Sequence, residues 1–211
     1  MQQLLRTVDH LVLAVPDLHQ AIAEVHELTG VKPKIGGQHM GRGTWNALLA
    51  LGHDTYLELI APDPQQVLPE KGCWMGVDQI KEPKLIHWAA KVHPIVDVIK
   101  KAKNHQVQIG KLSSSSRTRI NGQVLSWMLT EPVSGEDGGL LPFLIDWEDS
   151  DHPAESLPQK CKLIHLEGRH PHPEQINAQL AVLDIQMEIS LGNRPQLLAS
   201  INTPNGVVSF F

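Results

Sequence analysis

The 211-residue sequence predicts an α+β fold of three βαβββ repeats, two of them paired into a curled eight-stranded sheet that encloses a cleft. Three similar apolar stretches, each with one histidine near its start, indicate the repeat: residues 8–18, 85–94 and 162–169. Two of these stretches begin with the same letters, Lys84-Leu85-Ile86-His87 and Lys162-Leu163-Ile164-His165. A helical pattern and further strand patterns follow each stretch. The predicted domain boundaries are 1–61, 84–148 and 162–211.

The first repeat begins with a buried strand over residues 7–15. A helix should follow from Pro16-Asp17, because apolar residues then recur at helical spacing, and Gly30 should end it. Three strands complete the repeat, at residues 31–35, 44–51 and 55–60, with turns at 36–37 and 52–54. The proline-rich residues 62–83 read as a long connection.

The same order is predicted twice more. Repeat two should have a strand at 85–92, a helix at 94–103, strands at 107–112, 124–130 and 140–147, and a polar loop at Ser113–Ser116. Repeat three should have a strand at 163–166, a helix at 174–183, and strands at 187–191, 197–201 and 207–210, after a loose connection at 148–160. Because a helix covers one face of each four-stranded sheet, the other face needs a partner. Pairing of repeats one and two would enclose the cleft.

Composition narrows the classes of function. Hydrophobic residues make up 41% and charged residues 19%, which is typical of a globular protein. The net charge of −5 and the scattered Lys and Arg give no reason to expect a nucleic-acid partner. No apolar run reaches the roughly 18 residues of a membrane span. Cys73 and Cys161 lack Cys-x-x-Cys spacing, which indicates reduced thiols in the cytoplasm.

Six short segments together resemble a known family. They are Val8-Asp9-His10-Leu11-Val12, Gly43-Thr44-Trp45-Asn46, Tyr56-Leu57-Glu58-Leu59-Ile60, Arg117 with Gly122-Gln123-Val124-Leu125-Ser126-Trp127, Leu141-Pro142-Phe143-Leu144-Ile145-Asp146-Trp147 and Thr203-Pro204-Asn205-Gly206. They cover most of the chain and resemble the glyoxalase-like domain family of the vicinal-oxygen-chelate superfamily, home of glyoxalase I, extradiol dioxygenases and bleomycin-resistance proteins. That resemblance implies a fold but not one reaction, because members isomerise, cleave rings or only bind.

The resemblance also implies a metal site, since ligands in this superfamily come from the first and fourth strands of paired repeats. Position by position, it implies His10, Glu58 and His87. Two imidazoles and a carboxylate suit Fe(II), Zn, Mn, Ni or Co and leave positions open for substrate. Alignment of the two repeats places Ile145 opposite Glu58, and the neighbouring Asp146 should point to the other face. The site therefore binds a divalent metal through three protein groups, or it is a metal-free cluster of histidine and glutamate.

Other residues are expected to line the cleft. His39 could act as a general base, because the unperturbed pKa of histidine lies near neutrality, or it could be a loop residue. Arg117 could hold a substrate carboxylate or phosphate through paired hydrogen bonds. Asn46 is a further candidate for substrate binding, and Trp127 could form an apolar wall.

Three functions remain open. The first is a metal-dependent lyase or isomerase acting on a small oxygenated substrate chelated in the cleft. The second is an Fe(II) ring-cleaving dioxygenase, and the third is a metal-free protein of the bleomycin-resistance type that binds or sequesters a small molecule. The partner expected in each case is a small molecule. Because repeat three has no partner in the chain, it either caps the cleft pair or joins a second chain in a homodimer, which we favour.

Overall fold

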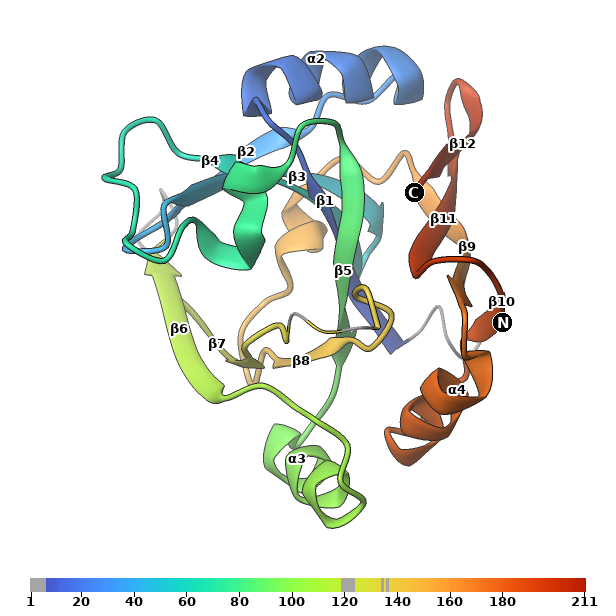
Figure 1. Cartoon of the computed structure of the whole chain (residues 1–211). Helices are drawn as coiled ribbons and strands as arrows, with labels where there is room; N and C mark the ends of the chain where they lie inside the picture. The colour runs from blue at the N-terminus through green and yellow to red at the C-terminus, as the bar shows by residue number, and fades with distance from the viewer. Residues whose placement is uncertain (1–6, 119–123, 134, 136) are drawn as a thin grey trace. The chain divides into compact units, whose positions relative to one another are not determined.

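The computed structural model describes residues 7–118, 124–133, 135 and 137–211, without the side chains of residues 116–118 and 124 (Figure 1). The strands are β1 (Val8–Ala14), β2 (Lys34–His39), β3 (Thr44–Gly52), β4 (Thr55–Pro62), β5 (Lys84–Lys91), β6 (Leu112–Thr118), β7 (Val124–Thr130), β8 (Phe143–Asp146), β9 (Lys162–His170), β10 (Glu188–Leu191), β11 (Gln196–Thr203) and β12 (Gly206–Phe210). The helices are α2 (Leu18–Thr29), α3 (Ile95–Asn104) and α4 (Pro173–Val182), with 3-10 turns η1 (Trp74–Gln79) and η2 (Pro153–Ser156).

Hydrogen bonds connect the strands into two sheets. Eight strands follow the order β2-β3-β4-β1-β5-β8-β7-β6, and four follow the order β10-β9-β11-β12. Each of the three segments runs in the order βαβββ. The predicted α+β fold class is therefore confirmed. The predicted domain boundaries and the homodimer stay predictions.

The chain divides into two compact bodies. Body A comprises residues 10–86, 153–165 and 198–211. Body B comprises the described residues among 7–9, 87–152 and 166–197. Among the described residues, no helix combines the length and the apolarity that a membrane crossing requires.

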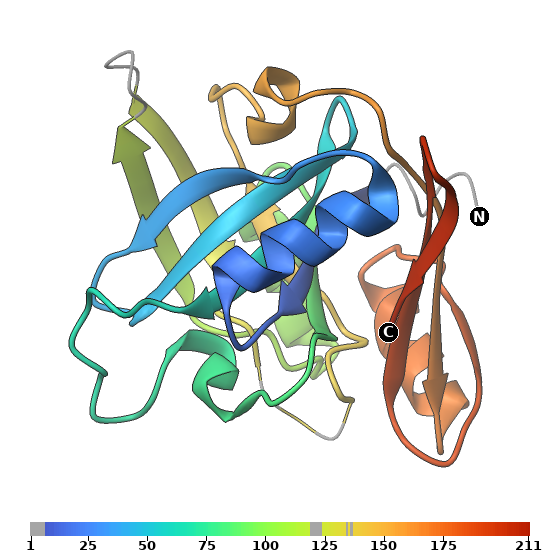
Figure 2. The same cartoon turned by 90° about the horizontal axis from the view of Figure 1, so that it is seen from above.

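In body A, helix α2 covers one face of the strands β3 and β4 (Figure 2). Asp17 caps the helix, because its Oδ1 accepts the Gln20 N–H at 2.8 Å, and Gly30 ends it with φ 72°. The face that α2 buries consists of Leu18, Ala21, Ile22, Val25 and Thr29. Side chains alternate along a strand, so every second residue of β1, β3 and β4 points away from the helix.

Strand β2 differs from the prediction. It runs from Lys34 to His39, whereas a strand at 31–35 and a turn at Gly36-Gly37 were predicted. The two glycines lie inside the strand, where the register with β3 shifts between Ile35 and Gly37. A Cβ at Gly36 would lie 2.3 Å from Asn46 Oδ1, so the glycine permits a close approach of that side chain.

In body B, the register of β5, β8 and β7 separates two faces. Ala89 pairs with Phe143, and Leu129 pairs with Ile145, so these residues share a face with His87. The opposite face carries the fully buried Trp88 and lies toward α3. The Trp88 indole N–H donates to the carbonyl oxygen of Leu140 at 2.9 Å.

Two strands of body B were predicted wrongly. Residues 113–116, predicted to be a polar loop, belong to β6, and the strand predicted at 107–112 starts only at Leu112. Strand β6 is the last strand of its sheet and pairs antiparallel with β7, with Ser113 opposite Leu129 and Ser115 opposite Trp127. The backbone supplies these bonds, so a serine run can form an edge strand. Strand β8 covers only Phe143–Asp146 of the predicted 140–147.

Candidate functional site

The buried carboxylate of Glu58 is the centre of the candidate site in body A. Glu58 lies on β4 and is 5% exposed. Its Oε1 accepts a hydrogen bond from Asn46 Nδ2 at 2.5 Å. His10 Nε2 lies 3.7 Å from Oε2, and His39 Nε2 lies 3.6 Å from Oε1. A carboxylate without partners would be costly to bury, and here one imidazole stands at each oxygen.

Strand pairing explains why these side chains meet. His10 pairs with Tyr56 across β1 and β4, and Glu58 pairs with Leu48 across β4 and β3. Asn46 is two residues from Leu48, so it shares the same face. Two histidines, a carboxylate and an amide thus come from β1 to β4, on the face away from α2.

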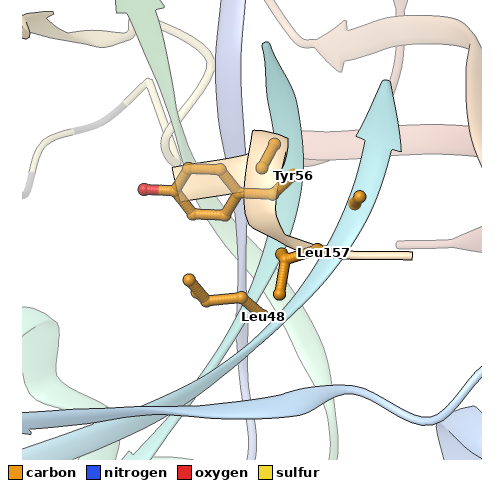
Figure 3. Packing of buried hydrophobic residues seen from close by; sticks show 5 residues of the cluster. Leu48, Tyr56 and Leu157 are labelled. Carbon is orange, nitrogen blue, oxygen red and sulfur yellow. The ribbon is translucent and has the colours of Figure 1, made fainter. Parts of the chain in front are cut away.

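Apolar packing closes one side of the site. The ring of Tyr56 stacks on that of His10 at 4.6 Å and 10°. Tyr56 belongs to a buried cluster with Leu48, Leu157 and two alanines (Figure 3). Leu157 follows η2, within the connection that the sequence indicated only as loose. The cluster therefore packs beside the ring that stacks on His10.

Hydrogen bonds fix the amide of Asn46. Its Oδ1 accepts the Gly37 N–H at 3.0 Å, and its Nδ2 lies 3.2 Å from His39 Nε2 as well as donating to Glu58. His39 Nδ1 in turn lies 2.9 Å from Thr44 Oγ1. The amide therefore connects the carboxylate with the second histidine.

Trp74 is a neighbour of the site that the sequence did not single out. Its ring meets that of His39 in a T-shaped contact at 5.3 Å, and the Arg42 guanidinium lies 4.3 Å from the centre of the same ring. Trp74 lies on η1, in the predicted connection at 62–83. A tryptophan inside a segment rich in proline and glycine was the available signal.

His87, the third predicted ligand, is in body B. It is 7% exposed, and no hydrogen-bond partner of its Nδ1 is found among the described residues. Burial lowers the pKa of His87, and the carboxylate of Asp137 opposes this shift. A neutral imidazole with an unpaired buried nitrogen can bind a metal or a hydrogen-bonding ligand.

Two residues that were predicted to bind the substrate, Trp127 and Arg117, also lie in body B. Trp127 is half-buried on β7, and its ring lies 5.2 Å from that of Trp147. The Trp147 indole donates to the fully buried carboxylate of Asp9 at 2.8 Å. Arg117 lies on β6 opposite Leu125, and its side chain is outside the described residues. The roles of Trp127 and Arg117 in substrate binding stay predictions.

The register corrects the alignment of the fourth ligand position. In body A, Glu58 pairs with Val12, two residues after His10. In body B, the residue two after His87 is Ala89, and it pairs with Phe143. Phe143, and not Ile145, is therefore equivalent to Glu58. Sequence alignment missed this because the equivalence depends on the pairing of β5 with β8.

Asp146 does not supply the missing ligand. Its carboxylate is 4% exposed, and Oδ2 accepts the N–H of Ile95, the first residue of α3, at 3.1 Å. It therefore points away from the face of His87, as the alternation along a strand predicted. The second repeat offers an apolar residue where the first has a carboxylate.

Comparisons with known proteins agree with this architecture. Residues 8–183 match the model of a family described as a glyoxalase-like domain. A comparison with curated proteins finds no match. A hypothetical protein from Staphylococcus aureus is similar over 97% of this chain and 98% of its own, with a TM-score of 0.71 and 15% identity.

Two structures of named enzymes are also similar. A mutant of 4-hydroxymandelate synthase from Streptomyces coelicolor has a TM-score of 0.52 and 12% identity, over 97% of this chain and 61% of its own. Methylmalonyl-CoA epimerase from Mycobacterium tuberculosis has a TM-score of 0.46 and 21% identity, over 69% of this chain and 90% of its own. At such identities, similarity of structure concerns the fold and not the reaction.

Proposed function

This chain belongs to the glyoxalase-like domain family, and on that premise we propose that it is a metal-dependent lyase or isomerase acting on a small oxygenated substrate. The observation that carries the proposal is the buried Glu58 carboxylate, with His10 near one oxygen and His39 near the other. A buried acid between two imidazoles is a costly arrangement that packing alone does not require.

His10 and Glu58 can serve as two ligands of one divalent ion in this proposal. His10 Nε2 and Glu58 Oε2 are 3.7 Å apart, too far for a hydrogen bond between them. Two ligands of one tetrahedral zinc ion lie about 3.3 Å apart, so a small adjustment would suffice. We propose that His87, whose Nδ1 has no hydrogen-bond partner among the described residues, supplies a second imidazole. When bound, a divalent ion would act as a Lewis acid on oxygen atoms of the substrate.

The other residues of the site supply positioning and proton transfer in this proposal. Asn46 orients Glu58 through its amide N–H, which is how a ligand carboxylate is held in many metal sites. His39 takes a proton from the substrate as general base. Trp127 and Arg117 contact the substrate, the first as an apolar wall and the second as a partner for an acidic group.

A metal-free binding protein is the second candidate. The apolar Phe143 at the position equivalent to Glu58 favours it, because the four-ligand pattern of glyoxalase I is then incomplete. In that case His10 and His39 would serve as hydrogen-bonding partners of a bound small molecule. The two candidates differ in one measurable property, which is stoichiometric uptake of metal.

Metal loading tests the proposal. The purified chain is stripped with chelator, dialysed against Fe(II), Zn, Mn, Ni or Co salts, and analysed by mass spectrometry for bound metal. We expect about one ion per chain, lost in Glu58→Gln and in His87→Ala. His53→Ala, in an exposed turn of body A, is the matched control and should load fully.

The outcomes separate the candidates. Uptake by the wild type and the control, with loss in both site variants, supports the proposal. Absence of stoichiometric uptake from all five salts overturns it in favour of metal-free binding. Uptake confined to Fe(II), together with oxygen consumption on catechol-type substrates, would instead indicate the ring-cleaving alternative.

A further inference from the structure

The connection after β4 is built onto the hairpin between β2 and β3. The Asp63 N–H donates to the carbonyl oxygen of Gly43 at 2.9 Å, and the Cys73 thiol donates to the same oxygen at 3.1 Å. The Trp74 N–H donates to the carbonyl oxygen of Arg42 at 2.9 Å. These bonds hold both ends of residues 63–74 against the hairpin turn that follows His39.

Side chains strengthen this attachment. Gln66 Oε1 accepts the Gly41 N–H at 3.1 Å, and Gln66 Nε2 donates to the carbonyl oxygen of Thr44 at 3.2 Å. A Cβ at Gly43 would lie 2.7 Å from Pro69 Cδ, so the two segments are in close contact. Residues 63–74 are therefore an ordered part of body A and cover the tip of the hairpin.

This attachment fixes Trp74 beside His39. The backbone bond to Arg42 sets the start of η1, and the Arg42 guanidinium lies over the indole at 4.3 Å. The indole then meets the His39 ring at 5.3 Å and 80°. Only 21% of the His39 side chain is exposed, and the contact with Trp74 is part of the packing that covers the rest.

The hydrogen bonds of Asn46 determine which nitrogen of His39 carries the proton in the neutral ring. Asn46 Oδ1 accepts the Gly37 N–H, so the group facing His39 Nε2 is the amide nitrogen, which only donates. Nε2 must then accept. The proton of the neutral imidazole is on Nδ1, where Thr44 Oγ1 accepts it at 2.9 Å.

We propose that Trp74 is a positioning residue which, with Asn46 and Thr44, holds His39 as the neutral Nδ1–H tautomer. The lone pair of Nε2 then points toward Asn46 and the carboxylate of Glu58. The inference rests on the proposed function only where it assigns proton transfer to that nitrogen. Tautomer and ring orientation can be measured without metal or substrate.

Nitrogen-15 NMR of histidine-labelled, metal-free full chain tests the inference at about pH 8.5, well above the unperturbed histidine pKa of about 6.5. The pair of ring-nitrogen signals that disappears in His39→Gln is assigned to His39. The test variants are Trp74→Leu, Trp74→Phe and Thr44→Val. Trp45→Leu is the matched control, because Trp45 makes the same T-shaped contact with His19 at 5.1 Å and 79°.

We expect the wild type to show a pyrrole-type Nδ1 and a pyridine-type Nε2 for His39. In Trp74→Leu the ring is free to turn away from Asn46 and Thr44, so a mixture of the two tautomers should appear, and Trp74→Phe should keep most of the wild-type pattern. Thr44→Val should move the proton toward Nε2, because Nδ1–H loses its acceptor. Trp45→Leu should change the signals of His19 and leave those of His39.

Two results would overturn the inference: an Nε2–H tautomer in the wild type, or unchanged His39 signals in Trp74→Leu. A general loss of packing would move His39 equally in Trp74→Leu and Trp45→Leu, which also counts against a positioning role. If Trp74→Leu does not fold, Trp74→Phe and Thr44→Val still decide the tautomer. Failure of metal loading leaves these signals as expected, so the two proposals fail separately.

Discussion

Replacing Asp146 by alanine should remove a buried anchor between β8 and α3. Its Oδ2 accepts the Ile95 N–H at 3.1 Å, and its Oδ1 accepts the Glu148 N–H at 3.0 Å. His93 Nδ1 lies 3.1 Å from both oxygens. Asp146 thus caps α3 from a distant strand, since Pro94, the residue before the helix, offers no side-chain cap.

The magnitude follows from the two backbone donors. The Ile95 N–H is buried, and a buried N–H left without a partner costs about 1–3 kcal/mol. The Glu148 N–H is only part-buried and costs less, and loss of a helix cap typically costs about 1 kcal/mol. Water can reach part of the helix end in the variant, so we expect Asp146→Ala to lower the free energy of unfolding by about 2–4 kcal/mol. Asp146→Asn keeps one acceptor oxygen and should lose about half as much.

The contact between Asp146 and His93 predicts how the stability of the fold depends on pH. Burial raises the pKa of the Asp146 carboxyl, but hydrogen bonds from Glu148, His93 and Ile95 outweigh it, so the folded pKa is below the ordinary value. Its contribution is present above the unfolded pKa of about 3.9 and is lost as pH falls through the folded value. The hydrogen bond to Asp146 raises the pKa of His93, so its contribution is present below about 6.5 and is lost as pH rises through the folded value.

Urea unfolding followed by tryptophan fluorescence at about pH 5, 7 and 9 measures both effects. The wild type should lose stability toward pH 9, and His93→Gln should remove that alkaline loss. The free energy of unfolding that is lost in Asp146→Ala should be largest at the pH where Asp146 and His93 are both charged. A change below about 0.5 kcal/mol in Asp146→Ala, or an unchanged alkaline slope in His93→Gln, would refute the reasoning.

Three further expectations concern packing and thiol reactivity. Leu157→Ala should cost about 2–3 kcal/mol in urea unfolding because it opens a cavity in a buried cluster, and a loss under about 1 kcal/mol would contradict that packing. Gly43→Ala should cost about 1–3 kcal/mol, since φ is +69° and the new Cβ would lie 2.7 Å from Pro69; wild-type stability would show that the turn can relax. Burial raises the pKa of the Cys73 and Cys161 thiols, so both should react with a thiol reagent only as fast as the chain opens, and rapid labelling of the native protein would contradict this.

The periodicity of the sequence was sufficient for the fold class and for several elements. Helix α2 starts after Asp17 and ends at Gly30, as the cap residue and the helical spacing indicated. Strands β1 and β4 lie where continuous apolar runs predicted buried strands. These features depend on local propensity and on burial, which are encoded residue by residue.

The sequence was a poorer guide where the backbone of another strand decides the structure. Gly36 and Gly37 form a bulge in β2 instead of a turn, because Asn46 approaches them from β3. Ser113–Ser116 extend along β7 although their side chains are polar. Edge strands and bulges depend on hydrogen bonds to a partner strand, and side-chain pattern says little about them.

In the candidate site, too, some features followed from the sequence and others only from the tertiary structure. The family resemblance named His10 and Glu58, and the register of β1 with β4 places them on one face. The partners of Glu58, the fixed amide of Asn46 and the contact of His39 with Trp74 depended on strand register and on the docking of residues 63–74. A shift of one residue in register would turn every side chain to the other face, so tertiary packing, which sets the register, decided which groups meet.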